Sequence, residues 1–237
     1  MKRITALLLA LSLAVSFTAC AESKNEETTA LSDTQSASAA TEAASSKSND
    51  TENSKILIAY FSYGENAEFP DDVDASSSAS IQMLNGKITG NTGLIADYIA
   101  KATGGDIFSI LTAEKYSSNY NDIVDAGQAE KNNNVKPEIV THIDNLDDYD
   151  TVFIGFPNWW YGMPMVMYTF FDEYDFSGKT IVPFCTSGGS AFSDSINEMK
   201  ELEPNAVVID DGLHIGASSA SGAESQVNEW VNGLNIG

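Results

Sequence analysis

The sequence is poor in basic residues. It has 12 lysine and arginine residues against 34 aspartate and glutamate residues, which gives a formal net charge of −22 at pH 7. A chain with this much negative charge is repelled by the phosphate backbone of a nucleic acid and by an anionic lipid surface. The composition therefore argues against both as partners and suits partners that are basic or cationic.

Cysteine and histidine are also scarce, with two residues of each. A disulfide between Cys20 and Cys185 is the simplest expectation for an exported chain. Cys20, however, precedes a long polar segment, whereas Cys185 ends an apolar run. We therefore expect Cys185 to be a buried thiol rather than half of a bridge or a nucleophile. His142 and His214 form no metal-binding pattern with Cys185, so the sequence predicts no metal site and no catalytic residues.

The apolar run at the N-terminus is too short for a membrane-spanning helix and has the wrong flanks. Met1-Lys2-Arg3 is followed by the apolar stretch Ile4–Val15 and then by Phe17-Thr18-Ala19-Cys20. This order is typical of a secretory signal peptide, here residues 1–19. Small residues before a cysteine resemble the lipobox of bacterial lipoproteins, in which the cysteine is acylated and becomes the mature N-terminus. We expect lipidation of Cys20 and an extracytoplasmic location on the bacterial membrane; ordinary cleavage, with Cys20 lost or inert, is the alternative.

Residues 20–54 lack the side chains needed to build a core. After Cys20 the segment is rich in Ser, Thr, Ala, Glu and Asn, has no aromatic residue, and has Leu31 as its one large apolar residue. Such a segment cannot bury enough apolar surface to offset the entropy lost on ordering. It is predicted to be a disordered tether that holds the folded domain, residues 55–237, away from the membrane surface.

From residue 55 onward, short apolar runs alternate with helical patterns. Five runs are apolar at consecutive positions, as expected of strands covered on both faces: Ile56–Phe61, Ile107–Leu111, Val152–Phe156, Ile181–Phe184 and Ala206–Ile209. Helical spacing of apolar residues occurs over Leu94–Ile99, Val166–Phe171, Phe192–Met199 and Val227–Leu234, and more weakly over Asn121–Lys131. The alternation predicts an α/β domain, a doubly wound five-stranded parallel sheet with helices on both faces. Pro183 predicts a distortion of the fourth strand.

The segments that follow the strands are the candidate site, because ligands of such a sheet bind at the carboxyl ends of its strands. The first strand closes on Ser62, and Thr89-Gly90-Asn91-Thr92 is expected to open the next helix. The N–H groups and dipole of a helix N-terminus bind anions without Lys or Arg. Pro157–Pro164, with two adjacent tryptophans, follows the third strand, and Thr186–Ser190, with two glycines, follows the fourth.

Each of these loops also has a plain structural interpretation. Thr89–Thr92 can be a simple helix cap, one of the tryptophans can belong to the core, and Ser187–Ser190 can be only a tight turn before a helix. Together, however, they supply an anion site, an aromatic platform for a planar ring and an open backbone edge. A planar ring that carries a phosphate tail fits all three, and flavin mononucleotide (FMN) is such a molecule.

The motifs in these positions resemble those of the flavodoxin family over the whole folded part. The segments that carry the resemblance are Ala59–Ser62, Gly90-Asn91-Thr92, Gly155–Trp160 with Met163-Pro164, and Pro183–Ser190. In that family the first loop binds the FMN phosphate and the next two flank the isoalloxazine ring. The resemblance implies a flavodoxin-like fold, FMN as the cofactor, and cofactor-binding roles for Ser62, Tyr63, Gly90, Asn91, Thr92, Pro157, Asn158, Trp159, Trp160, Tyr161, Gly162, Thr186, Ser187, Gly188 and Gly189.

One departure from that family is the long connection, residues 63–88, between the first strand and the helix. Ordinary flavodoxins join these elements within a few residues, whereas this chain inserts 26. A connection of this length can form a flap near the flavin or a partner surface. A tolerated surface insertion is the expectation that we favour.

The resemblance implies an FMN-dependent electron-transfer protein or oxidoreductase, anchored by lipid outside the cytoplasmic membrane. Its partner would be a redox protein or a small electron acceptor. Two alternatives stay open. One is an NAD(P)H-dependent FMN quinone or flavin reductase, although the sequence has no second nucleotide-binding motif. The other is a flavodoxin-like scaffold that has lost its flavin and binds a partner.

Overall fold

The computed structural model describes residues 55–70, 80–234 and 236. The expected signal peptide, Cys20 and the tether lie outside the described residues, and so does the part of the long connection at residues 71–79. No helix within the described ranges combines the length and the apolar character that a membrane span requires.

The described chain alternates strands and helices in the order that the sequence predicts for most of its length. The elements are β1 (Ile56–Phe61), the 3₁₀ helix η1 (Tyr63–Glu65), β2 (Ile81–Leu84), β3 (Lys87–Gly90), α1 (Asn91–Thr103), β4 (Asp106–Ile110), α2 (Tyr120–Asn133), η2 (Leu146–Asp148), β5 (Thr151–Pro157), α3 (Met165–Glu173), β6 (Thr180–Ser187), α4 (Ser195–Leu202), β7 (Val207–Val208), β8 (Leu213–Gly216), η3 (Ala217–Gly222) and α5 (Glu224–Gly233).

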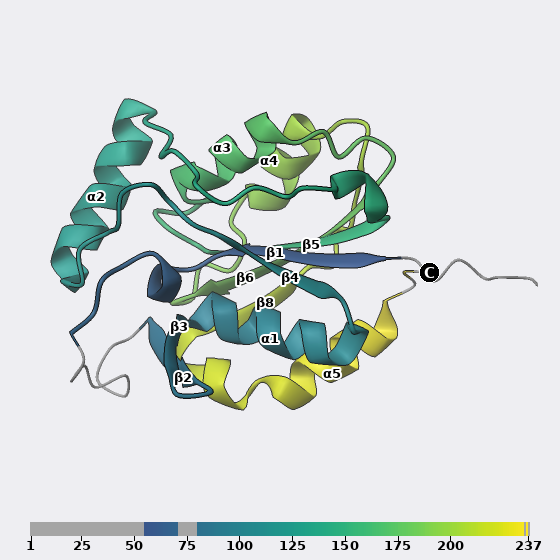
Figure 1. The fold of residues 1–237 in the computed structure, drawn as a ribbon, viewed down its shortest axis with the longest axis horizontal. Helices are drawn as coiled ribbons and strands as arrows, with labels where there is room; N and C mark the ends of the chain where they lie inside the picture. Colours follow the sequence, from purple (N-terminus) through teal and green to yellow (C-terminus); the bar gives the residue numbers. More distant parts are fainter. Residues whose placement is uncertain (1–54, 71–79, 235, 237) are drawn as a thin grey trace, which may run out of the picture. The chain divides into compact units, whose positions relative to one another are not determined.

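The main sheet is parallel and doubly wound, as predicted. Its strand order is β4-β1-β5-β6-β7, with β8 also paired to β6, and every pair in it is parallel. Helices α3 and α4 cover one face, and α1 and α5 cover the other (Figure 1). The strand order reverses at β1, which has β4 on one side and β5 on the other. The crevice at the carboxyl ends of β1 and β5 is therefore the expected ligand position.

All five predicted strands are present, as β1, β4, β5, β6 and β7, and the sheet has a sixth, β8, because its fifth position is divided into two short strands. Strand β7 pairs with the start of β6, and β8 pairs with its end. Pro183 lies between these two stretches of β6. The carbonyl of Ile181 accepts from Ile209 N–H, so Pro183, two residues on, directs its backbone nitrogen to the same side. The N–H that proline lacks thus faces the gap between β7 and β8, and β6 itself continues unbroken.

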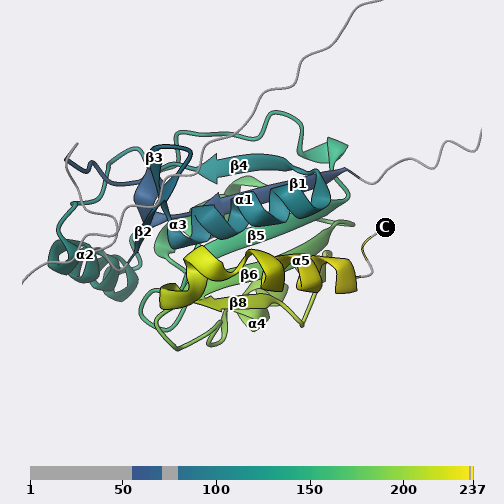
Figure 2. The same cartoon turned by 90° about the horizontal axis from the view of Figure 1, so that it is seen from below.

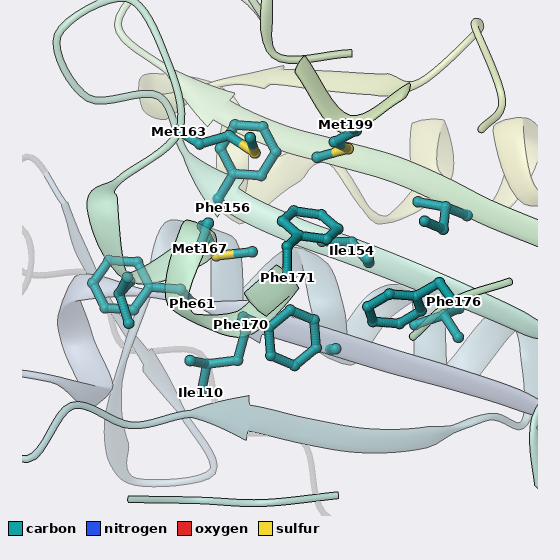
Figure 3. Close-up of a cluster of buried hydrophobic side chains, with 14 of the residues drawn as sticks. Phe61, Ile110, Ile154, Phe156, Met163, Met167, Phe170, Phe171, Phe176 and Met199 are labelled. Atoms are coloured by element: carbon teal, nitrogen blue, oxygen red, sulfur yellow. The ribbon is translucent and has the colours of Figure 1, made fainter. Parts of the chain in front are cut away.

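Two apolar layers hold the sheet between its helices. On the α3 and α4 side, Phe61, Phe156, Phe170 and their neighbours are buried in one cluster, drawn in Figure 3. On the α1 and α5 side, a second cluster includes Phe153, from the same strand as Phe156. Along β5, Val152 and Ile154 lie in the first cluster and Phe153 lies in the second. Consecutive strand residues thus pack into opposite layers, which explains the uninterrupted apolar runs in the sequence. Cys185 is a free thiol within the first cluster, as predicted.

The long connection is built into the fold, so its interpretation as a tolerated surface insertion is wrong for the described part. Strands β2 and β3 form an antiparallel hairpin, and Figure 2 shows it beside the start of α1, at the same end of the domain as α2. Tyr63 and Ile81 are buried and pack with Ile123 of α2 in a small third cluster. Gly90 ends β3 and Asn91 begins α1, so Thr89 and Gly90 lie in a strand instead of opening the helix.

Candidate functional site

A cavity of about 370 Å³ lies at the carboxyl ends of β1, β5 and β6. This volume falls in the range of small-molecule and cofactor sites. The residues that line it are Ser62, Tyr63, Ser80, Asn91, Thr92, Tyr120, Ile123, Val124, Gly127, Pro157, Asn158, Trp159, Trp160, Thr186, Ser187, Gly188 and Ala217. None of these side chains carries a charge, so the cavity in the described part of the chain is polar but uncharged.

The cavity collects most of the site residues that the sequence predicts. Those that line it are Ser62, Tyr63, Asn91, Thr92, Pro157, Asn158, Trp159, Trp160, Thr186, Ser187 and Gly188. Gly90, Tyr161 and Gly189 are outside the lining, although each adjoins a residue that belongs to it. Gly162 is also outside, and it exchanges backbone hydrogen bonds with Trp159 of the lining. The structure thus brings the three predicted loops to one place. Contact between these residues and a cofactor stays a prediction.

The first end of the cavity is the N-terminus of α1. Gly90 is the N-cap residue, and no side chain among the described residues caps this helix. The free N–H groups of a first helical turn and the helix dipole favour an anion there. Ser62 adds a hydroxyl that is 1% exposed and has no hydrogen-bond partner among the described residues. A Cβ at Gly90 would lie 1.8 Å from Ser62 Oγ, so only glycine leaves room for this hydroxyl.

The long connection holds this helix end in place. Glu65 accepts hydrogen bonds from the Thr89 hydroxyl and from Gly90 N–H, and the Asn91 N–H donates to the Ser80 carbonyl at 3.1 Å. Gln82 Nε2 donates to Asn91 Oδ1 at 2.7 Å. Glu65 lies near the start of the long connection, and Ser80 and Gln82 lie near its end. Two separate parts of the connection therefore support the N-terminus of α1.

A threonine pair joins two of the predicted loops. Thr92 Oγ1, in the first turn of α1, and Thr186 Oγ1, near the end of β6, are 2.8 Å apart, and both side chains are buried. The anion-binding end and the glycine-rich loop are therefore linked directly, with no intervening side chain.

The two adjacent tryptophans have different surroundings. Trp159 packs edge-on against Phe61 and Tyr116, with ring centroids 5.4 Å apart in each case. Gly127 of α2 lies against its other side, where a Cβ would come within 3.2 Å of the indole. Trp160 is 37% exposed, and its indole N–H donates to the Val124 carbonyl at 3.0 Å.

Trp160 and Tyr161 occupy a strained turn. Their φ angles are +52° and +61°, in the left-handed region that residues other than glycine rarely adopt. The flanking residues Trp159 and Gly162 exchange both backbone hydrogen bonds, at 3.0 and 3.2 Å, as in a two-residue hairpin turn. Lys131 of α2 donates to the Trp160 carbonyl at 2.8 Å. Contacts from α2 thus hold the turn that presents Trp160 to the cavity.

At the other end of the cavity, Asn158 has an unsatisfied acceptor. Its Nδ2 donates to the Ala191 carbonyl at 2.7 Å and to Ser193 Oγ at 3.1 Å, whereas its buried Oδ1 has no partner among the described residues. An acceptor of this kind suits a ligand that carries an N–H donor, because a buried polar atom is costly when left unpaired.

Helix α2 is the part of the site that the sequence analysis missed. Tyr120, Ile123, Val124 and Gly127 line the cavity with the i, i+3, i+4 and i+7 spacing of one helix face. Ile123 and Gly127 are the only buried residues of α2. A helix that buries so little of its surface needs few apolar residues, so its sequence gives only a weak helical pattern. The periodicity of the cavity-facing positions is the one signal that points to it.

Tyr116, the tyrosine that packs against Trp159, stays uncharged. Burial, together with nearby Glu130, raises the pKa of Tyr116 above its ordinary value, so the phenol keeps its proton and donates to Glu130. Among the described residues, no group of three or more His, Cys, Asp or Glu is placed to hold a metal ion. The geometry therefore favours a planar organic ligand with an anionic end.

Comparison with known proteins agrees with this arrangement. A family model described as Flavodoxin matches residues 83–234, which is more than half of the chain. The chain belongs to the flavodoxin family. The resemblance drawn from the sequence motifs is thus confirmed, and the strand order matches the doubly wound sheet expected of a flavodoxin. No curated protein matches the chain.

Several solved structures are similar to this flavodoxin-family chain. A candidate flavoprotein from Bacteroides uniformis is 27% identical with a TM-score of 0.56, and the match covers 76% of this chain and 98% of that one. Another from Bacteroides eggerthii is 27% identical with a TM-score of 0.54, covering 78% and 100%. A flavoprotein from Lactobacillus acidophilus in complex with FMN is 19% identical with a TM-score of 0.50, covering 73% and 99%, and supports the fold.

Proposed function

We propose that this flavodoxin-family protein binds FMN in the cavity and transfers electrons outside the cytoplasmic membrane. The observation that carries the proposal is a pair of orphaned buried atoms. Ser62 Oγ and Asn158 Oδ1 both belong to residues that line one uncharged cavity, and neither has a partner among the described residues. A hydroxyl suits a phosphate oxygen, and an amide oxygen suits a ring N–H. FMN carries both groups.

The remaining residues fit the same cofactor. The N-terminus of α1, with Ser62 and Thr92, would hold the phosphate by N–H and O–H groups alone. Trp159 and Trp160 would flank the ring, and Thr186–Gly188 would present a backbone edge to it. The long connection fixes the phosphate end, whereas α2 excludes water from the side opposite the sheet.

The flavin, when bound, supplies the redox chemistry. The residues of this chain bind it, orient it and control access to it, and none of them is proposed as a catalytic group. An aromatic, uncharged cavity in an acidic protein disfavours added negative charge, and so favours a low reduction potential. The electron partner would be a redox protein or a small acceptor that meets the cavity at Trp160.

The proposed location rests on the sequence. A signal peptide over residues 1–19 and an acylated Cys20 would place the protein outside the cytoplasmic membrane, with residues 20–54 as the tether. Mass spectrometry of the protein extracted from membranes tests this, because an intact lipoprotein begins at a diacylated Cys20. A mature N-terminus at any other residue contradicts the anchor.

The absorbance spectrum of the purified protein, before and after addition of FMN and then NADH, tests the cofactor. The proposal expects flavin bands that are carried by the protein, with free FMN fluorescence quenched on binding. Bleaching by NADH would identify the protein as an NAD(P)H-dependent reductase. Fluorescence that stays unquenched would leave the flavin-free scaffold as the function.

Ser62→Ala tests the phosphate end separately. Because Ser62 Oγ has no partner among the described residues, its removal should cost only a ligand contact. We expect FMN affinity to fall about tenfold, as for one hydrogen bond to a charged group, and riboflavin affinity to stay within about twofold. Titration of both flavins by fluorescence measures the difference. Ser219→Ala, at an exposed site in η3, is the control, and an equal loss for both flavins would contradict the phosphate assignment.

A further inference from the structure

The loop that follows β6 is held in an unfavourable backbone conformation. Gly189 has a φ of +143°, and Ala191 and Ser193 have φ angles of +48° and +52°. Non-glycine residues in this left-handed region cost about 1–2 kcal/mol each. Such a loop keeps its shape only when surrounding contacts determine it. Since Ser187 and Gly188 line the cavity, those contacts decide which backbone edge a ligand meets.

One hydroxyl group supplies much of this constraint. Ser187 Oγ accepts the N–H of Gly189 at 3.1 Å and the N–H of Ala191 at 3.0 Å. It also lies 2.9 Å from His214 Nε2. On the other side of the loop, Asn158 Nδ2 donates to the Ala191 carbonyl. The strained Ala191 is thus held through both of its backbone polar groups.

Counting protons around Ser187 fixes the state of His214. A serine hydroxyl has two acceptor lone pairs and one donor hydrogen. The two backbone N–H groups use both lone pairs, so the hydroxyl hydrogen must point to His214 Nε2. This count assigns Nε2 as the acceptor and the ring proton to Nδ1. A cationic ring would offer a second donor where no lone pair remains.

The divided fifth strand brings the imidazole to this position. His214 pairs in register with Cys185, and β8 runs beside the carboxyl half of β6 only. Ser187, two residues beyond Cys185, extends toward the same side of β6. A histidine in β7 would lie beside the start of β6, far from the loop.

We propose that neutral His214 is a positioning residue for the loop 187–193, and that through Ser187 it sets the backbone edge presented to the flavin ring. This rests on the proposed function for the identity of the ring, whereas the link from His214 to the loop does not. His214 is not itself part of the cavity lining, and its hydrogen bond to the lining is the one to Ser187, so it acts through Ser187.

The link to the loop is tested without flavin, by NMR on the protein as purified. The imidazole ¹⁵N spectrum should show a protonated Nδ1 and an unprotonated Nε2 for His214. In His214→Leu and in Ser187→Ala, amide hydrogen exchange of Gly189 and Ala191 should become about tenfold faster, as for the loss of one hydrogen bond. The double variant should exchange no faster than Ser187→Ala alone, because His214 reaches the loop through the Ser187 hydroxyl.

His214→Gln is the matched control, because its amide oxygen can accept the Ser187 proton where the Leu side chain cannot. It should keep the exchange rates within about threefold of the unchanged protein. A protonated Nε2, or unchanged exchange at Gly189 and Ala191 in both His214→Leu and Ser187→Ala, would overturn the proposal. Ser187→Ala removes one oxygen atom only, and so keeps the test valid if His214→Leu fails to fold.

The link to the ring is tested by titration with FMN and with riboflavin. His214→Leu should weaken both flavins by a similar factor, because the loop faces the part that the two share, whereas Ser62→Ala should separate them. A loosened loop with unchanged affinity for both would overturn the link to the ring. If the unchanged protein binds neither flavin, the proposed function fails, and the NMR measurements still decide the role of His214.

Discussion

Gly90 occupies a position in this site where even a methyl side chain does not fit. A Cβ at this position would lie 1.8 Å from Ser62 Oγ, far inside contact distance, and 3.0 Å from the Gly64 nitrogen. Both neighbours belong to the segment that follows β1, and Gly64 lies in η1, so this segment packs directly against the residue that precedes α1.

We expect Gly90→Ala to weaken FMN binding at least about tenfold and to destabilise the fold by about 1–3 kcal/mol, as for an overpacked buried site. Flavin titration and urea unfolding measure the two effects. Gly222→Ala is the control, because no atom lies within 4 Å of the Cβ it would add. Similar behaviour of the two variants would show that the turn is looser than the geometry indicates.

Cys185 is a residue whose ionisation is tied to folding. Burial raises the pKa of its thiol from 9.0 to about 12. Between these values the unfolded chain loses a proton that the folded chain keeps, so folding stability contributed by this group is present below pH 9 and is lost as the pH rises toward 12.

Thiol alkylation followed by peptide mapping checks this expectation, since mapping separates Cys185 from Cys20. At pH 8 Cys185 should be protected in the folded protein and should react fully in urea. Rapid alkylation of the folded protein would contradict the burial. Cys185→Ala should flatten the decline in stability above pH 9, apart from the share that the buried tyrosines contribute.

The sequence predicts individual site residues well where they follow a strand directly. Ser62, Asn158 and Thr186 stand immediately after or at the end of β1, β5 and β6, so strand prediction alone places them at the carboxyl edge of the sheet. His214 could not be found this way. Its partner Ser187 is 27 residues away, and the pairing depends on the register of β8 against β6.

At the scale of the element, Asn66 ties the first part of the long connection to the sheet. Its side chain is completely buried and makes four hydrogen bonds: Nδ2 to the carbonyls of Ser62 and Ile110, and Oδ1 from the N–H and hydroxyl of Thr112. It therefore joins the segment after β1 to the segment after β4.

We expect Asn66→Ala to lower the free energy of unfolding by about 3 kcal/mol, because it leaves several buried backbone groups without partners. Urea denaturation measures this value. Asn133→Ala, which removes one exposed side-chain hydrogen bond on α2, is the matched control and should change stability by less than about 0.5 kcal/mol. If Asn66→Ala lowers the free energy of unfolding no more than the control does, water must satisfy the groups that Asn66 leaves, which would contradict this expectation.

Predictability also differs among the elements. The long apolar strands and the amphipathic helices α1, α3 and α5 follow from periodicity. Hairpin β2–β3 had a local signal that was missed: Asn85-Gly86, with φ angles of +52° and +77°, forms a two-residue turn of the kind this dipeptide favours. The division of the fifth strand had none: the apolar run Ala206–Ile209 predicts β7, whereas β8, Leu213–Gly216, has no such run.

At the scale of the whole molecule, a strongly acidic chain contains a cavity that is lined by uncharged side chains. Acidic residues near the cavity should oppose reduction of a bound flavin, and distant ones should have little effect because salt screens them. Asp125 is exposed on α2, next to Val124 of the cavity lining, whereas Asp147 lies before β5 at the opposite end of the sheet.

We expect Asp125→Asn to raise the reduction potential of the bound flavin by an amount on the order of 10 mV at low salt. Asp147→Asn should leave the potential unchanged. Spectroelectrochemical titration of both variants at low and high salt measures the shifts. Equal shifts, or a shift at Asp125 that does not shrink in high salt, would argue against an electrostatic origin.

The position of β1 in the sheet has a practical consequence. The family match begins at Met83, yet the strand between β4 and β5 is Ile56–Phe61, on the far side of the long connection. A fragment trimmed to the recognisable family sequence would lose β1, an interior strand, and leave the facing edges of β4 and β5 ready to join other chains. Conversely, a short peptide that contains β1 and a long fragment that contains the rest of the domain would meet along two strand pairs, β1 with β4 and β1 with β5. This fold is therefore suited to a reporter that is reassembled from two pieces.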